Sequence, residues 1–153
     1  MAIVALAAVV AVGGWLLWPK PSEESLIIEL VAKAEHGVET KNAQEIVGCV
    51  ARDYRDPSGL THADIVRLAM QWQRTAEQTE VVIDEYRLEI TPPTARGEFE
   101  VELSFSEGGR QGPPERMALT VEFEKQRTGL LRRSWLVKSV SGHGLERDVE
   151  GLM

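Results

Sequence analysis

The spacing of apolar residues changes once along this chain, near Thr79, and that change limits the folds open to it. Before Thr79, apolar residues recur every three or four positions, which is typical of amphipathic helices. After it they alternate with polar residues, which is typical of strands with one buried and one solvated face. With 153 residues, the chain has room for one globular domain. This order predicts an α+β domain in which helices come first and an antiparallel sheet follows.

Three helices are predicted in the first half of the chain. The first begins after Ser22, a good N-cap residue, and its apolar spacing continues to Val38. A short second helix starts at Ala43 and ends near Asp53. The third begins at Thr61, because an acidic residue three positions later completes a variant of the capping box.

Four strands are predicted in the second half. Residues 98–106 and 117–124 alternate strictly between apolar and polar side chains, so each has one buried and one wet face. They are expected to pair antiparallel across residues 107–114, a long flexible hairpin loop rich in glycine and proline. Residues 81–90 precede this pair, and residues 135–141 follow it.

The strand at residues 81–90 changes phase in its middle. Its apolar residues fall on one face of a regular strand before the change and on the other face after it. A slip of one residue near Asp84 and Glu85 indicates a β-bulge, which bends a strand. With the bulge in place, the apolar side chains share one buried face: Val81, Ile83, Tyr86, Leu88 and Ile90. Arg87 and Glu89 are then expected to be exposed.

Residues 1–18 differ from the rest of the chain because they contain no charged side chain. At a helical rise of ~1.5 Å per residue they would span roughly 27 Å, close to the hydrocarbon thickness of a bilayer. Tryptophans at the end of this segment suit the headgroup level, and residues 19–21 form a short tether that stops the helix. We therefore expect a single-pass membrane anchor. The alternatives are a cleaved signal peptide, which normally needs a basic residue before the apolar run, and a buried helix of the domain.

The side of the membrane on which the domain lies depends on very few charges. The α-amino group precedes the apolar segment and Lys20 follows it, so the positive-inside rule favours the cytoplasmic side by a single charge and leaves the side of the domain undetermined. Residues 22–143 remain for the globular domain. Residues 144–153 are expected to form a C-terminal tail.

Charge and cysteine content exclude several classes of protein. The net charge of −7, without a basic block, makes a nucleic-acid partner a poor fit. The single cysteine, Cys49, can form neither an internal disulfide nor a CxxC metal site. His36, His62 and His143 have no ligand partner at metal-binding spacing. No metal and no cofactor is therefore predicted.

Three short motifs suggest a family. Asp53-Tyr54-Arg55-Asp56-Pro57 forms a turn after the second helix, the third helix opens with Thr61-His62-Ala63-Asp64, and the last strand begins Trp135-Leu136-Val137. In this order they resemble the NTF2-like (SnoaL-like, cystatin-type) superfamily over roughly residues 22–143. The resemblance implies three helices packed in a strongly curved, mainly antiparallel sheet of about four or five strands, with a pocket between sheet and helices. One hydrophobic helix would precede this cone. Members include ketosteroid isomerases, dehydratases and cyclases, as well as non-catalytic binding modules, and many are dimers.

Seven residues are candidates for such a pocket because they are acids, aromatics or inner-face positions of the expected sheet. They are Asp53, Tyr54, Trp72, Asp84, Tyr86, Val101 and Trp135. The alternative for the turn is structural, with Tyr54 packed on the core and the neighbouring acids bonded to backbone N–H groups. The alternative for Asp84 is a side chain turned outward by the bulge, and the alternative for the aromatics is an ordinary core.

Two functions follow from these residues. In the first, the chain is a membrane-tethered, non-catalytic module that binds a small apolar ligand or a partner protein, because the inner-face positions of the strands supply no carboxylate. In the second, it is an isomerase or dehydratase of the ketosteroid-isomerase type. Asp84 or Asp53 would then be the base, and Tyr54 or Tyr86 the oxyanion donor.

The polar faces of the strands carry many charges. Acidic residues lie at Glu98, Glu100, Glu102, Glu122 and Glu124, and basic residues lie at Lys125, Arg127, Arg132, Arg133 and Lys138. Pairs between acidic and basic residues across neighbouring strands are expected on this outer face. A face this polar does not suit a tight sheet-to-sheet dimer, so we expect a monomer or a weak homodimer.

Overall fold

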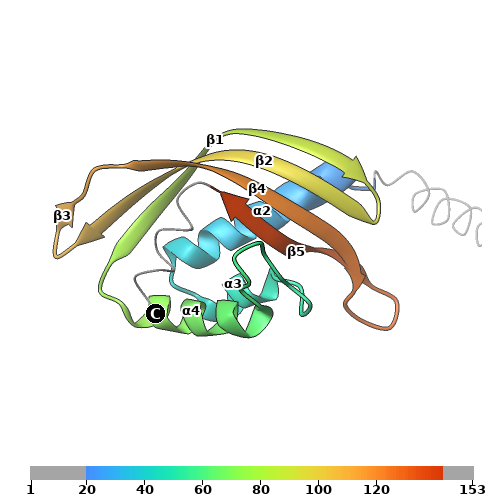
Figure 1. The fold of residues 1–153 in the computed structure, drawn as a ribbon, viewed down its shortest axis with the longest axis horizontal. Coiled ribbons are helices and arrows are strands. Elements are labelled where there is room, and N and C mark those ends of the chain that lie inside the picture. The colour runs from blue at the N-terminus through green and yellow to red at the C-terminus, as the bar shows by residue number, and fades with distance from the viewer. Residues whose placement is uncertain (1–19, 143–153) are drawn as a thin grey trace, which may run out of the picture.

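The computed structural model describes residues 20–142, which form three helices and a five-stranded antiparallel sheet (Figure 1). The helices are α2 (Glu23–Glu39), α3 (Ala43–Gly48) and α4 (His62–Arg74). The strands are β1 (Gln78–Thr91), β2 (Thr94–Glu107), β3 (Arg110–Gln111), β4 (Glu115–Arg127) and β5 (Arg133–Gly142). Their order in the sheet is β1-β2-β4-β5, and the short β3 pairs with β2.

The predicted anchor (residues 1–18), the first residue of the tether and the predicted tail (residues 144–153) lie outside the described residues. Within residues 20–142, no helix combines the length and the apolar character needed to cross a bilayer.

The sheet curls over α2, and α3 and α4 continue the helical layer beneath it (Figure 1). The predicted fold class, an α+β domain with helices inside a curved antiparallel sheet, is confirmed. The two strictly alternating segments pair antiparallel as β2 and β4, with Phe99 opposite Leu119 and Val101 opposite Met117. Their inner faces therefore point together toward the helices.

The helix starts agree with the predicted caps. Ser22 Oγ accepts a hydrogen bond from the backbone N of Ser25 at 3.1 Å. At the third helix, the backbone N and the hydroxyl of Thr61 both donate to Asp64 Oδ2 at 2.9 Å. Each contact provides a partner for a polar group that the helix itself leaves unpaired.

The second helix ends at Gly48, earlier than the predicted end near Asp53. The cause is a long-range pairing with β5. Cys49 O accepts from Val137 N at 2.8 Å, and Ala51 N donates to Val137 O at 2.9 Å. These bonds add the segment after α3 to the edge of β5, so its backbone cannot continue as a helix.

The core lies between α2 and the middle of the sheet. Ile27 of α2 is completely buried, and its neighbours from the strands are buried around it. These strand residues are Ala95, Phe99, Val101, Val121, Phe123 and Trp135. Phe99 packs edge-on against Phe123, with 6.3 Å between ring centroids. The alternation in the sequence therefore identifies the buried face of the sheet correctly.

The predicted bulge in β1 is present. The register with β2 shifts between Ile83 and Glu85, which leaves Asp84 without a partner residue. Ile83 lies opposite Val101, and after the shift Tyr86 lies opposite Phe99. The apolar residues on both sides of the bulge thus share the inner face.

The predicted burial of Tyr86 is wrong, because 48% of this residue is exposed. Its ring stacks on Phe99 with 6.2 Å between centroids. Since β1 is an edge strand, no further strand covers the other side of the ring. Leu88 and Ile90 are half-buried, while Arg87 and Glu89 are exposed as predicted.

Two further features of the sheet were not predicted. A second register shift, between β4 and β5, leaves Lys138 without a partner residue and adds to the curvature. The segment expected to be one long flexible loop contains β3, which pairs with the end of β2 around Gly108 and Gly109. Both glycines have positive φ angles, 58° and 78°, which lets the chain reverse tightly there.

Candidate functional site

The turn after α3 holds its phenol and one acid in a structural arrangement. Only 5% of Tyr54 is exposed, and its hydroxyl donates to Asp56 Oδ2 at 2.9 Å. Burial, and then Asp56, raise the pKa of Tyr54 well above its usual range. Asp56 also accepts bonds from the Ser58 hydroxyl at 2.6 Å and from Leu60 N at 3.0 Å. The phenol proton is therefore already bonded within the turn.

Asp53 lies away from the concave side, at the outer edge of β5. Its carboxylate pairs with Lys138 and accepts a bond from Gln126 Nε2 at 2.9 Å. The hydrogen bond from Lys138, followed by that from Gln126, lowers the pKa of Asp53. A carboxylate held in its ionised form and exposed to water is a weak base for proton abstraction.

Asp84 points to the outer face because of the bulge in β1. It lines an open groove of about 290 Å³ whose other walls include Glu100 and Arg116. Arg116 is itself paired with Glu102 at 3.1 Å. The helices lie on the other side of the sheet, so Asp84 does not face the concave side.

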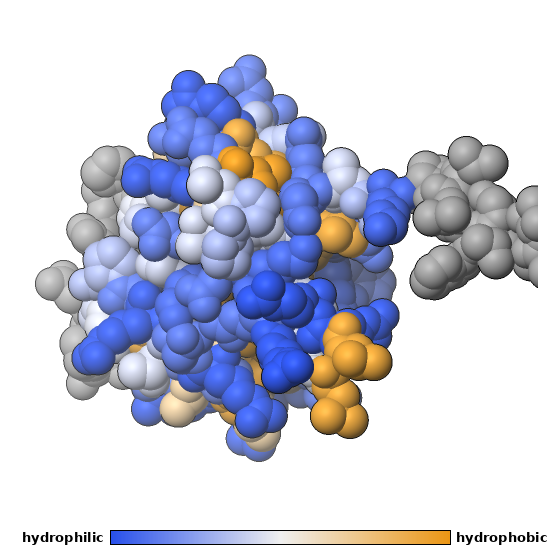
Figure 2. Space-filling model, turned by 90° about the vertical axis from the view of Figure 1, so that its right-hand side faces the viewer, coloured by the Kyte–Doolittle hydropathy of each residue, from blue (hydrophilic) through white to orange (hydrophobic). Residues whose placement is uncertain are grey.

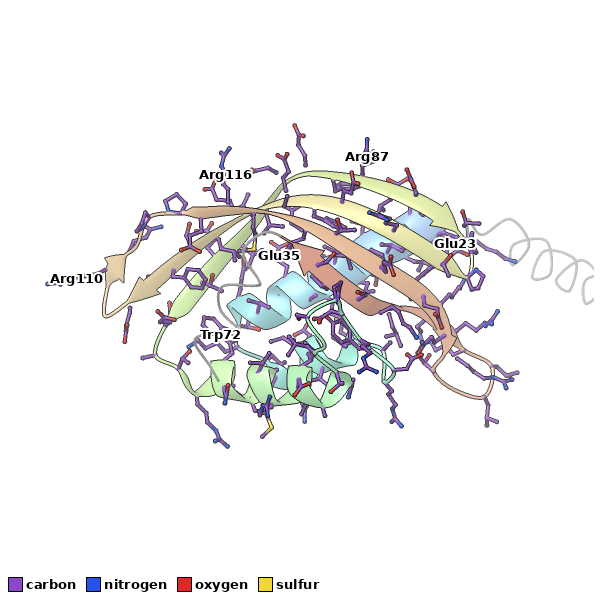
Figure 3. All side chains as sticks on the ribbon, in the orientation of Figure 1. Glu23, Glu35, Trp72, Arg87, Arg110 and Arg116 are labelled. Atoms are coloured by element: carbon purple, nitrogen blue, oxygen red, sulfur yellow. The ribbon has the colours of Figure 1, made fainter. Side chains whose placement is uncertain are left out.

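The aromatic candidates have separate structural contacts. Trp72 Nε1 donates to Val38 O at 2.9 Å, and Lys41 Nζ lies 4.7 Å from the centre of the indole ring, so Trp72 joins α4 to α2 (Figure 3). Trp135 is buried in the core, and its Nε1 donates to Glu23 Oε2 at 2.6 Å. The seven candidate residues thus lie in five different places. Asp53 and Tyr54 belong to the turn after α3, Val101 and Trp135 to the core, Trp72 to the contact between α4 and α2, Tyr86 to the exposed edge of the sheet, and Asp84 to its outer face.

One acid on the helical layer was missed by the sequence analysis. Glu35 follows Ile27 and Val31 at intervals of four residues, so it lies on the flank of α2 that faces the sheet (Figure 3). Burial, and then the nearby charge of Glu39, raise the pKa of Glu35. The signal was present in the sequence as a carboxylate that continues the apolar spacing of the helix.

The concave face beside the core is apolar and only partly covered. Several inner-face side chains of β2 and β4 are half-buried and pack at the margin of the core: Leu103, Met117 and Leu119. Phe105, further along the same face of β2, is also half-buried. Together these side chains form a partly exposed apolar row at the margin of the core.

Among residues 20–142, no group of three potential metal ligands lies together. His36 lies 3.1 Å from Glu45 Oε2 in an exposed pair on the helices. Cys49 is buried, and burial raises the pKa of its thiol, which donates to Glu45 O at 3.2 Å. A protonated, enclosed thiol is a poor nucleophile.

The outer face of the sheet carries ion pairs, and only some of them are the pairs predicted from the sequence. Lys138 lies 3.8 Å from Glu124, which fits the prediction, while Glu98 and Glu102 pair with Arg87 and Arg116. Lys125 was expected on this face and instead points inward, where its Nζ bonds Glu23 Oε1 at 2.7 Å. In the described part of the chain, no carboxylate pairs with the three remaining basic residues: Arg127, Arg132 and Arg133.

Comparison with known proteins places the chain by its fold. No protein-family model and no curated protein matches the sequence. Aln2 from a Streptomyces species is similar with a TM-score of 0.67 over 87% of this chain and 98% of its own, at 12% identity. An NTF2-like protein with a cystatin-like fold from Novosphingobium aromaticivorans is similar with a TM-score of 0.64 over 83% of this chain and 88% of its own, at 14% identity.

A third similar structure, from Catenulispora acidiphila, is a complex with S-DNPA. It has a TM-score of 0.64 over 83% of this chain and 96% of its own, at 13% identity. Such identities show a shared fold and leave the activity to be argued from this chain's own residues. The domain described by residues 20–142 has the NTF2-like, cystatin-like α+β fold.

Proposed function

We propose that this chain is a membrane-tethered, non-catalytic NTF2-like module. Its concave face binds a small apolar ligand or an apolar segment of a partner protein. One observation carries the proposal: the acids and phenols that proton-transfer chemistry would need lie in different parts of the domain, and most are already engaged in structural contacts.

An isomerase of the enolate-forming type needs a base and a hydrogen-bond donor directed at the same region of the substrate. Tyr54 donates its proton to Asp56 within the turn. Asp53 is ion-paired at the edge of β5, and Asp84 lines a groove on the outer face. Neither acid therefore shares a site with the buried phenol.

The half-buried apolar row on the concave face supports ligand binding. Removing apolar surface from water contributes roughly 25 cal/mol per Å². Leu103, Phe105, Met117 and Leu119 would gain this contribution on contact with an apolar ligand. The similar Catenulispora acidiphila protein forms a complex with S-DNPA, which supports ligand binding on this fold.

The tether is part of the same proposal. Residues 1–18 carry no charge, and the first helix of the domain starts at Glu23, directly after a short proline-containing link. A single-pass anchor there would hold the domain close to the bilayer surface. Membrane proximity would in turn give the domain access to apolar molecules that partition into lipid.

Ligand binding can be tested with a neutral apolar fluorescent probe, N-phenyl-1-naphthylamine. Val101→Trp fills the concave face and should abolish binding. Leu103→Trp places the same bulk at a half-buried position and should weaken binding with less effect on the core. Glu100→Trp is the matched control, because this exposed neighbour points to the outer face. Equal binding by all three variants would contradict a site on the concave face.

The alternative function is catalytic and rests on Glu35. Glu35 lies on the sheet-facing flank of α2, and its pKa is raised, which is the direction of shift that suits a general base. It would act without a phenol partner from the turn, since Tyr54 is bonded to Asp56. Glu35→Gln separates the two functions. A loss of turnover of about a hundredfold, with folding and probe binding preserved, would favour the enzyme.

A further inference from the structure

The tip of the β4–β5 hairpin, residues 127–133, exposes two leucines almost completely. Leu130 is 91% exposed and Leu131 is 101% exposed, more than any other large apolar residue of the described chain. Exposed apolar side chains that stand together at a loop tip are a common feature of surfaces that contact a partner or a membrane. Figure 2 views this end of the molecule and shows an apolar patch that protrudes from a largely hydrophilic surface.

Three arginines surround the two leucines. Arg127, Arg132 and Arg133 are exposed, and no carboxylate within residues 20–142 pairs with them. Arg127 Nη2 donates to Leu130 O at 3.2 Å, which supports the shape of the tip. In a chain with a net charge of −7, this concentration of positive charge is a local exception. It complements an anionic surface.

The hairpin lies beside the point where the domain begins. Glu23, the first residue of α2, bonds Lys125 Nζ at 2.7 Å and Trp135 Nε1 at 2.6 Å. Both partners belong to the strands at the base of the hairpin. Figure 1 shows the start of α2 and the hairpin tip at the same end of the molecule, opposite β3. The uncharged segment 1–18 precedes this end directly in the sequence.

We propose that the tip of the β4–β5 hairpin is a second membrane contact, which docks on a bilayer that contains anionic lipids. Leu130 and Leu131 enter the boundary between headgroups and acyl chains, and the three arginines bind lipid phosphates. The inference rests on the proposed membrane tether and extends it. Two contacts at one end orient the domain, so that the β2–β3 hairpin points away from the membrane.

The test uses the full chain, reconstituted in vesicles of phosphatidylcholine with about 30% phosphatidylglycerol. An environment-sensitive fluorophore is attached at Leu131→Cys, and nitroxide-labelled lipids act as quenchers. Cys49 is buried, so its thiol does not compete for the label. Arg110→Cys, on the β2–β3 hairpin at the far end of the molecule, is the matched control position (Figure 3). Strong quenching is expected at position 131, with little at position 110.

Charge dependence separates lipid binding from mere proximity. Each arginine near an anionic surface should favour docking by about fivefold. Replacing all three by glutamine should therefore lower the ratio of docked to undocked hairpin on the order of a hundredfold. Pure phosphatidylcholine vesicles should have a similar effect, and Leu130→Ser should also reduce quenching.

Equal quenching at positions 131 and 110 would overturn the proposal. Quenching at position 131 that stays the same after the arginines are replaced would also overturn it. If the chain floats with vesicles while the label at position 131 stays in water, the tether stands and the hairpin contact fails. A chain that does not float with vesicles overturns both.

Discussion

Glu23 and Trp135 are joined by a 2.6 Å hydrogen bond from the indole Nε1 to the carboxylate, across 112 positions of sequence. The other carboxylate oxygen of Glu23 accepts a 2.7 Å bond from Lys125. One side chain at the first position of α2 thereby holds the last two long strands of the sheet. The contact links the start of the domain to the base of the β4–β5 hairpin.

The Glu23 contact should make stability depend on pH in a defined direction. The bonds from Lys125 and then Trp135 lower the pKa of Glu23 in the folded state. Because the pKa of Glu23 is lower in the folded than in the unfolded state, the stabilisation from this contact is complete above the pKa of an unfolded glutamate, about 4.3. It is lost as the pH falls through the pKa of the folded state. Glu23→Gln should therefore unfold at a lower temperature than the wild type at neutral pH. The difference in Tm should shrink in acid, as differential scanning calorimetry would show; a constant difference from neutral to acid pH would contradict this.

Substitutions at the two most obvious catalytic candidates should affect stability only. Tyr54→Phe removes the bond to Asp56 and should cost about 1 kcal/mol in the free energy of unfolding. Asp84→Ala, at an exposed bulge position, should change that free energy by less than about 0.5 kcal/mol. Urea titrations measure both values. Biological activity and binding of the apolar probe should stay largely intact in each variant. A hundredfold loss of turnover in either, with the fold preserved, would overturn the non-catalytic proposal.

Gly97 should not tolerate even one added methyl group. It is buried on β2, where a Cβ atom would overlap the ring of Phe99 and come within 2.9 Å of Leu88 Cδ2. Gly97→Ala should therefore cost about 1 to 3 kcal/mol in the free energy of unfolding, measured in urea. Gly48→Ala is the control, because no atom lies within 4 Å of its added Cβ. The control should be neutral or slightly stabilising, and the prediction fails if both variants have the same midpoint.

Deleting residues 1–21 should leave a domain that folds without a membrane. The deletion keeps Ser22, whose hydroxyl caps α2, and it leaves every described helix and strand intact. Circular dichroism should show the α+β content, and fractionation should recover the truncated chain in the supernatant. The full chain should stay with membranes in a carbonate wash, as expected of a spanning segment. Release of the full chain by carbonate, or misfolding of the shortened one, would count against the anchor.

Local patterns in the sequence were sufficient for the elements and for the buried face of the sheet. Strict alternation in residues 98–106 and 117–124 determines which side chains point together, because successive residues of a strand point to opposite faces. The phase slip near Asp84 located the bulge for the same reason. The spacing of Thr61 and Asp64 located the start of α4, since a capping box involves only neighbouring residues.

The tertiary structure alone decided the features that depend on distant partners. α3 ends at Gly48 because the next residues bond to β5, and Tyr86 is exposed because β1 lies at the edge of the sheet. Lys125 lies on the inner face two positions after Phe123, and only the folded chain brings it a partner, Glu23 at the start of α2. Periodicity determines the face on which a side chain lies, but coverage and pairing depend on packing between segments that are far apart in sequence. For that reason the sequence determined the order of the helices and of the four long strands and the apolar concave face. Only the folded chain separated the candidate acids and placed the β4–β5 hairpin beside the start of α2.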